Sequence, residues 1–405
     1  MSKLGEANEG REVKDYLKGL IQEEMNRGQS LKAMIPRPLK YSELEGLAVD
    51  CETKIEATLG LLQDIAGELE DRGDGDIRDL HRKLRQCHRY LALLESFGVT
   101  ALYCGTPEIG YLTKLVYKVH QEINFPVSPP SVACISTEYY YYHAVTNVIF
   151  VPLTESDYLL HIPDLFHEMG HAVFDRREEP RLEQSNKAYL EILQTITQHY
   201  HTLLKQKRRE TGPRMYPDLI RHLYQQWLNW IVEFFCDLFA LYTLGPAYAW
   251  AHLHLSSKTS DDVYRLPFPE WEEHPSDEAR MRMLRFGLEF QGFGTDAKAI
   301  EAKWNGMPFT HVSRPSRDYH YAYPDDLLKK VAGTVFEGLK RNRFNVVDAQ
   351  RLSQLGEDSI VHLLNEAWDH FWQDPCSFRK WEQGQVGELK ARLGVMDALH
   401  TPSNS

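Results

Sequence analysis

The stretch from Trp227 to Tyr242 constrains the fold more than any other part of the chain, because it is almost wholly hydrophobic. Its acidic residues are Glu233 and Asp237, four positions apart and therefore on one face of a helix. Carboxylates are seldom buried without a partner. We therefore expect a core helix over residues 217–244 whose two acids face a metal with its ligands or, in the alternative, a basic side chain.

A second apolar helix is predicted over residues 162–174, and it carries the segment His167-Glu168-Met169-Gly170-His171. Helical spacing places His167 and His171 one turn apart on one face, where both imidazoles can bind a single ion. Glu168 stands beside the first histidine, in the position of a carboxylate that takes a proton from metal-activated water. Two histidines that are simply satisfied in a core or on a surface remain the alternative interpretation.

We expect one Zn²⁺ ion to be bound by His167, His171 and Glu233, since a catalytic zinc ion takes three protein ligands and keeps one position open. Asp237 would accept the outer N–H group of a ligand histidine and fix its tautomer. Cys236 is predicted to point away from the face that holds the two acids, and to lie in the core.

The rest of the chain predicts a mainly helical α+β fold. A small sheet is expected to pack on the zinc-binding active-site helix, with strands at Ser131–Ser136 and Asn147–Pro152. The tyrosines at 139–142 fit either a half-buried strand or a substrate-facing surface. The expected organisation is a helical N-terminal region over 1–100, a core over 101–325, and a helical C-terminal region over 326–405 with a disordered tail. The remaining helices are expected at 42–69, 77–97, 182–211, 276–291, 327–340, 360–372 and 384–393.

Charge and composition narrow the class of protein. Lys and Arg number 46 against 58 Asp and Glu, so the formal net charge is −12, which disfavours binding to nucleic acid or to an anionic membrane. No uninterrupted apolar stretch has the length of a membrane helix, and the first residues lack the apolar stretch of a secretory signal. The six cysteines are scattered without a C-x-x-C pair, which favours free thiols and a cytoplasmic protein.

The pattern H-E-x-x-H followed on a later helix by E-x-x-x-D resembles the gluzincin metallopeptidases, the thermolysin-like clan. Two further stretches are similar to the branch that contains the prenyl-protein peptidases and their soluble relatives. The first is Asn147–Pro152, which the resemblance implies is an edge strand that pairs with extended substrate. The second runs from His274 through Pro275 to Arg280. The resemblance implies that His274 stabilises the oxyanion, and that Arg280 supports it or the helix of Glu233 and Asp237.

The resemblance covers about residues 131–290 and leaves both helical ends unmatched. Unlike the membrane-embedded peptidases of that branch, this chain has no predicted spanning helix. We expect a zinc-dependent peptidase in which zinc polarises the peptide carbonyl and Glu168 acts as the general base on water. A zinc hydrolase of another amide or ester, and an interaction protein with a metal-stabilised core, are the alternatives. The expected partners are a peptide or protein substrate and a protein that binds the helical ends.

Overall fold

The computed structural model describes residues 3–71, 78–103, 107–136, 139–152, 155–211, 216–266, 271–272 and 274–394. The chain divides into two compact units. Unit 1 comprises residues 1–114, 131–153 and 397–405, and unit 2 comprises residues 115–130 and 154–396. The predicted tail at 401–405 and most of the break predicted between the first helices lie outside the described residues. The observed units differ from the predicted regions, because the strands group with the N-terminal helices and the C-terminal helices group with the histidine-bearing helix.

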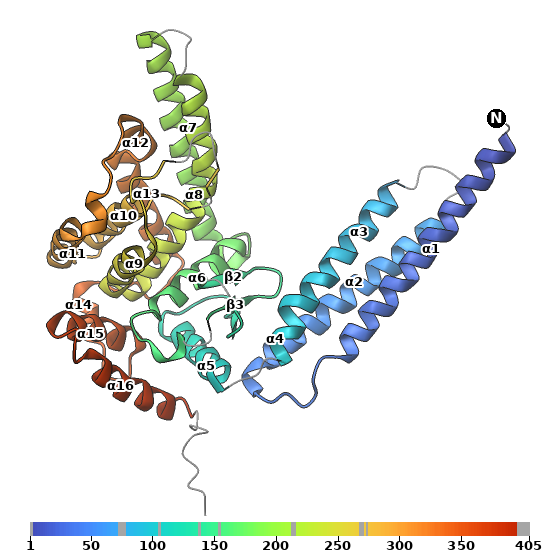
Figure 1. The fold of residues 1–405 in the computed structure, drawn as a ribbon, viewed down its shortest axis with the longest axis horizontal. Helices are drawn as coiled ribbons and strands as arrows, with labels where there is room; N and C mark the ends of the chain where they lie inside the picture. The colour runs from blue at the N-terminus through green and yellow to red at the C-terminus, as the bar shows by residue number, and fades with distance from the viewer. Residues whose placement is uncertain are drawn as a thin grey trace, which may run out of the picture. The chain divides into compact units, whose positions relative to one another are not determined.

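Unit 1 is built on three long helices that lie side by side, α1 (Lys3–Ala33), α2 (Glu45–Asp71) and α3 (Arg78–Leu93) (Figure 1). The helix predicted over 42–69 is confirmed as α2, and its apolar residues face the core, since Ile55, Leu62 and Ile65 are at most 3% exposed. The short helices of this unit are η1 (Ser42–Leu44), the π-helical η2 (Leu94–Val99) and α4 (Thr100–Tyr103), and α5 (Pro107–Glu122) begins in it.

A three-stranded sheet completes unit 1. Strands β1 (Ser131–Ala133) and β2 (Tyr141–His143) flank β3 (Val148–Phe150), with β1 parallel to β3 and β2 antiparallel to it. The last two tyrosines of the run, Tyr141 and Tyr142, therefore lie in a strand, and both are half-buried. The prediction that Asn147–Pro152 is an edge strand is wrong, because the second neighbour, β2, occupies the side that would have stayed open. Since the sheet and the histidine-bearing helix belong to different units, the packing of one on the other stays a prediction.

Unit 2 is helical. Its longer helices are α6 (Pro163–Asp175), α7 (Glu183–Thr211), α8 (Tyr216–Leu244), α9 (Pro246–Thr259), α10 (Asp277–Phe290), α11 (Gly294–Gly306), α13 (Asp325–Arg341), α15 (Ile360–Gln373) and α16 (Phe378–Arg392). Its short helical segments are η3 (Glu155–Asp157), η4 (Pro180–Leu182), η5 (Pro308–His311), α12 (Arg317–Ala322) and α14 (Ala349–Leu352). The predicted helices lie close to the observed ones, whereas α9 and α11 were not predicted.

Helix α8 is the central helix of unit 2 and packs against α6, α7, α10 and α13. Trp227, Trp230 and Phe234 on it are fully buried. Its segment Asp218–Leu244 is long and apolar enough to cross a membrane by composition alone, but 83% of its most apolar window is buried inside the structure. Such burial is typical of a core helix, as the sequence predicted for 217–244.

Helices α6 and α8 lie backbone against backbone at Gly170. A Cβ atom at this position would lie 2.8 Å from the Cα atom and 3.1 Å from the Cβ atom of Cys236. Contacts of that length are too short for carbon atoms, so only glycine allows the two backbones to come this near. A glycine inside a helix costs about 1 kcal/mol relative to alanine, and this close approach explains why α6 carries one.

Replacing Gly170 by Ala is expected to destabilise the protein by about 1–3 kcal/mol, because α6 must move away from α8. Gly387, inside α16 of the same unit, has no atom within 4 Å of its virtual Cβ and is the matched control. Gly387→Ala should leave stability unchanged or raise it by up to about 1 kcal/mol. Thermal unfolding followed by circular dichroism measures both. Equal melting temperatures for the two variants would contradict the packing argument.

Candidate metal centre

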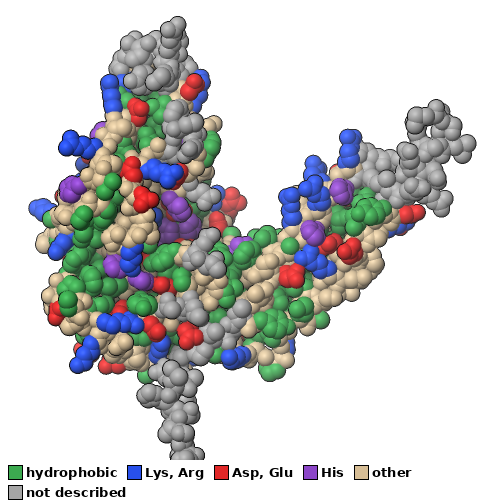
Figure 2. All heavy atoms as spheres, in the orientation of Figure 1, with side chains coloured by type: hydrophobic (Ala, Val, Ile, Leu, Met, Phe, Trp, Pro, Cys, Tyr) green, Lys and Arg blue, Asp and Glu red, His purple; other side chains and the backbone are tan. Residues whose placement is uncertain are grey.

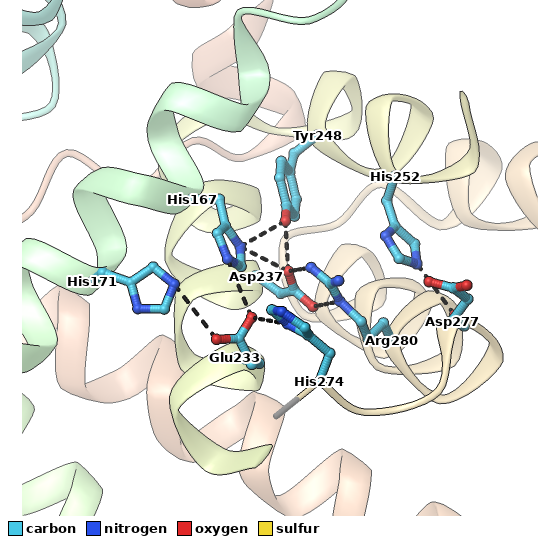
Figure 3. Close-up of polar contacts among 9 residues, drawn as sticks. All are labelled: His167, His171, Glu233, Asp237, Tyr248, His252, His274, Asp277 and Arg280. Atoms are coloured by element: carbon cyan, nitrogen blue, oxygen red, sulfur yellow. Dashed lines mark hydrogen bonds and ion pairs between the residues drawn. The ribbon is translucent and has the colours of Figure 1, made fainter. Parts of the chain in front are cut away.

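Helix α6 presents its two histidines as the sequence predicted. Pro163 occupies the first turn, where its missing N–H group costs nothing, and Asp164 follows it at the positive end of the helix dipole. The rings of His167 and His171 are 5.0 Å apart between centroids and come from successive turns (Figure 3). His167 is buried, and the side chain of His171 keeps 22% of its surface exposed. The pair therefore faces a position that solvent can reach.

Helix α8 brings Glu233 to both histidines. Its Oε2 lies 3.4 Å from Nε2 of His167, and its Oε1 lies 3.5 Å from Nε2 of His171. Two ligand bonds of about 2.1 Å that meet at a tetrahedral zinc ion hold their donor atoms about 3.4 Å apart. Each imidazole thus lies at ligand spacing from one oxygen of Glu233, Oε2 for His167 and Oε1 for His171.

Asp237, one turn further along α8, is fully buried and binds His167 from behind. Its Oδ1 lies 3.0 Å from Nδ1 of His167. Arg280 of α10 donates to the same carboxylate from Nε at 2.8 Å and from Nη2 at 2.6 Å. Burial alone would raise the pKa of Asp237, but the charge and hydrogen bonds of Arg280 and of His167 hold it well below its usual value. The resemblance implied that Arg280 supports either the oxyanion or the helix of Glu233 and Asp237. In the structure its guanidinium group contacts Asp237, which agrees with the second role.

Tyr248 of α9 is a member of this cluster that the sequence analysis missed. Its hydroxyl donates to Oδ1 of Asp237 at 2.5 Å and lies 2.9 Å from Nδ1 of His167 (Figure 3). Gly245, at a φ of 89°, and Pro246 turn the chain sharply between α8 and α9, which points the tyrosine back at α8. The sequence carried one signal for this role. Tyr248 stands among apolar residues, and a tyrosine hydroxyl that is buried needs a hydrogen-bond partner.

His274 reaches the site from the loop before α10. Its Nδ1 lies 2.9 Å from Oε2 of Glu233, and 62% of its side chain is exposed. The loop is fixed just beyond it, because Ser276 caps α10 and is hydrogen-bonded to the hydroxyls of Tyr319 and Tyr323. His274 is therefore the solvent-facing member of the cluster, whereas Arg280 is buried on its far side.

Cys236 lies closer to the histidines than the sequence predicted. One ligand atom each of His167, His171 and Cys236 lie within 4.8 Å of one another, so this buried group could hold a metal ion. The close approach at Gly170 explains the difference, because it brings the backbone of Cys236 directly against α6. Burial, followed by the charges of Glu233 and Glu168, raises the pKa of the Cys236 thiol well above its usual value.

The two histidines differ in protonation. Burial lowers the pKa of His167, but hydrogen bonds and attraction from Asp237 and Glu233 outweigh it and raise that pKa to about 10. Burial and the neighbouring charge of His167 lower the pKa of His171 to about 4. Glu168 is buried on α6, and its charge helps to raise the pKa of Cys236. Without an ion, His167 is therefore an imidazolium held between two carboxylates.

No protein-family model, curated protein or solved structure matches this chain. The resemblance to the gluzincins thus rests on the residues of the chain itself, from His167 to His171 together with Glu233 and Asp237.

Zinc binding is expected to release about one proton per ion at pH 6. His167, with a pKa of about 10, carries a proton there that the ion must displace, whereas His171, with a pKa of about 4, is already neutral. Water on zinc contributes little at this pH, since its pKa is about 7. Calorimetric titrations in two buffers of different ionisation enthalpy give the number of protons. Identical binding enthalpies in the two buffers would contradict the assignment.

Removing the Tyr248 hydroxyl in Tyr248→Phe is expected to weaken zinc binding about 10-fold, because His167 loses part of the support that orients its ring. Tyr242→Phe is the matched control, since it removes an equally buried hydroxyl that donates to the carbonyl of Ala332. Competition with a zinc chelator measures both affinities. The same affinity in the two variants would show that the Tyr248 contact only stabilises the fold.

Proposed function

We propose that the chain is a zinc-dependent hydrolase and, by its resemblance to the gluzincins, a peptidase. The observation that carries the proposal is the meeting of His167, His171 and Glu233, in which Nε2 of each histidine lies 3.4 or 3.5 Å from one oxygen of the carboxylate. A second, buried carboxylate supports the proposal as well, since Asp237 holds the outer nitrogen of His167. A structural zinc site closes with a fourth protein ligand and needs no neighbouring base, and Glu168 therefore favours catalysis.

Glu233 is the third ligand in this proposal, and Cys236 is the alternative. The pKa of Glu233 is held well below its usual value because hydrogen bonds from His167 and His274 outweigh the effect of burial. It is therefore ionised and ready to bind a cation. The pKa of the Cys236 thiol is raised by burial, so zinc would have to displace its proton on binding.

Each residue then has a defined task. Zinc, when bound, supplies a Lewis acid that lowers the pKa of water and polarises the substrate carbonyl. Glu168 takes a proton from water and passes it to the leaving amine. His274, at the exposed side, donates a hydrogen bond to the oxygen that becomes negative. Asp237, neutralised by Arg280, keeps the proton of His167 on Nδ1 so that Nε2 stays available.

The nature of the scissile bond rests on the resemblance. The expected edge strand at Asn147–Pro152 is not an edge, so it gives no support for an extended peptide substrate. A hydrolase of another amide would use the same residues. The cleavage assay below therefore includes a peptide library and small amide substrates.

Metal analysis of purified variants tests the ligand assignment. The zinc affinity of Glu233→Ala is expected to fall by about 10- to 100-fold or more, so that this variant is purified with little zinc. Cys236→Ala should keep its zinc. Circular dichroism controls for folding, because both side chains are buried. The reverse result, with zinc lost only in Cys236→Ala, would replace Glu233 by Cys236 as the third ligand.

Cleavage assays test the reaction. Glu168→Gln keeps the size of the side chain and removes its basicity, so zinc content should be unchanged while turnover falls about 10²- to 10⁴-fold. His274→Ala should lower turnover less, by about 10²-fold, with zinc retained. Wild-type turnover in Glu168→Gln would refute the mechanism. A zinc-loaded wild type that cleaves neither peptides nor small amides would refute the proposed function.

A further inference from the structure

Helix α3 carries a row of arginines on its solvent-exposed side. Arg78, Arg82, Arg85 and Arg89 follow one another at spacings of four, three and four residues, which is one stripe along a helix. The stripe is about 16 Å long at the helical rise of about 1.5 Å per residue. Figure 2 shows basic side chains along this helix. Such a concentration of positive charge is unexpected in a chain with a net charge of −12.

Three of these arginines have no carboxylate partner among the described residues. They are Arg82, Arg85 and Arg89, whereas the nearby Lys83 pairs with Glu68. The opposite side of α3 is buried, with Leu80, Leu84, Cys87 and Leu91 in the core of unit 1. Because that apolar side is occupied, α3 cannot insert into a membrane as a free amphipathic helix does.

A groove of about 520 Å³ runs between α2 and α3 beside the arginines. Its floor and walls are largely apolar, with Ala57, Leu61 and Ile65 from α2 and Cys87 and Tyr90 from α3. Leu61, which lines the groove, is 56% exposed and thus accessible to a partner. The groove therefore offers an apolar surface of the kind that receives a helix.

The groove and the arginines belong to one surface. Arg82 and Arg89 are seven residues apart and directly adjoin Lys83 and Tyr90, which line the groove. On a helix this places the two arginines at the flank of the groove, like the charged flanking positions of a coiled coil. A helix seated in the groove would pass within reach of both guanidinium groups.

We propose that the α2–α3 groove binds an amphipathic helix of a protein partner whose flank toward α3 carries Glu or Asp residues. Carboxylates repeating every three or four residues match the arginine row in period, and arginine binds them in bidentate geometry. Nucleic acid fits less well, because Asp64 and Glu68 on the α2 side would repel phosphates and the apolar floor gives phosphates no contact. The proposal concerns unit 1 alone and is independent of the reaction.

A synthetic peptide of about five helical turns, with leucines on one face, glutamates on one flank and neutral glutamines on the other, is the probe. Its binding to the full chain is measured by fluorescence anisotropy. Arg82→Glu/Arg89→Glu should weaken binding about 10-fold or more, and Leu61→Ser should also weaken it. The control variant Lys298→Glu/Lys380→Glu changes charge equally at two exposed lysines of unit 2 and should bind as wild type does.

A charge swap makes the test specific. The same peptide with lysines in place of glutamates should bind the wild type poorly and the Arg82→Glu/Arg89→Glu variant better. Failure of the glutamate peptide to bind the wild type would overturn the proposal. So would unchanged binding in both the arginine and the Leu61 variants, or a wild type that binds duplex DNA or anionic vesicles in preference to the peptide. Peptide-independent dimerisation lost in Leu61→Ser would instead assign the groove to a second copy of the chain.

Discussion

The site of unit 2 depends on the close approach of α6 and α8 at Gly170 and Cys236. Helix α6 contributes two histidines one turn apart together with Glu168, and α8 contributes two carboxylates one turn apart. The two pairs become a single cluster because the missing side chain of Gly170 lets the backbones approach at contact distance. The same contact holds the imidazole nitrogens at ligand spacing from Glu233. A bulkier residue at this point would alter core packing and site geometry together.

Charge balance is the second requirement, because the cluster is buried. Asp237 has no exposed surface, and it is tolerated since Arg280, Tyr248 and His167 together satisfy its oxygens. Glu233 lacks such a permanent counter-charge and relies on the histidines that face it. This asymmetry agrees with the proposed division of labour, in which Asp237 is fixed in place and Glu233 is the carboxylate that meets a cation.

Unit 1 uses charge differently. Its helices bury apolar stripes against one another in the usual way, but α3 leaves Arg82, Arg85 and Arg89 without carboxylate partners among the described residues. Solvated arginines carry no penalty, so folding does not require a partner for them. Their alignment beside an apolar groove is what indicates recognition of another molecule. Unit 2 thus carries the proposed chemistry and unit 1 the proposed docking surface.

The sequence by itself predicted most of the residues that the structure brings together at the candidate site. Helical periodicity is local, so the spacing of His167 and His171, and of Glu233 and Asp237, already placed each pair on one face. The cost of burying these groups unpaired then indicated that the pairs meet.

The tertiary structure decided what depends on contacts between distant segments. It placed Tyr248 behind His167, directed Arg280 to Asp237, and brought Cys236 near the histidines. It also made β3 a central strand. None of these can be deduced from periodicity. They follow from how tightly two helices pack, where a loop turns, and which strands pair with each other.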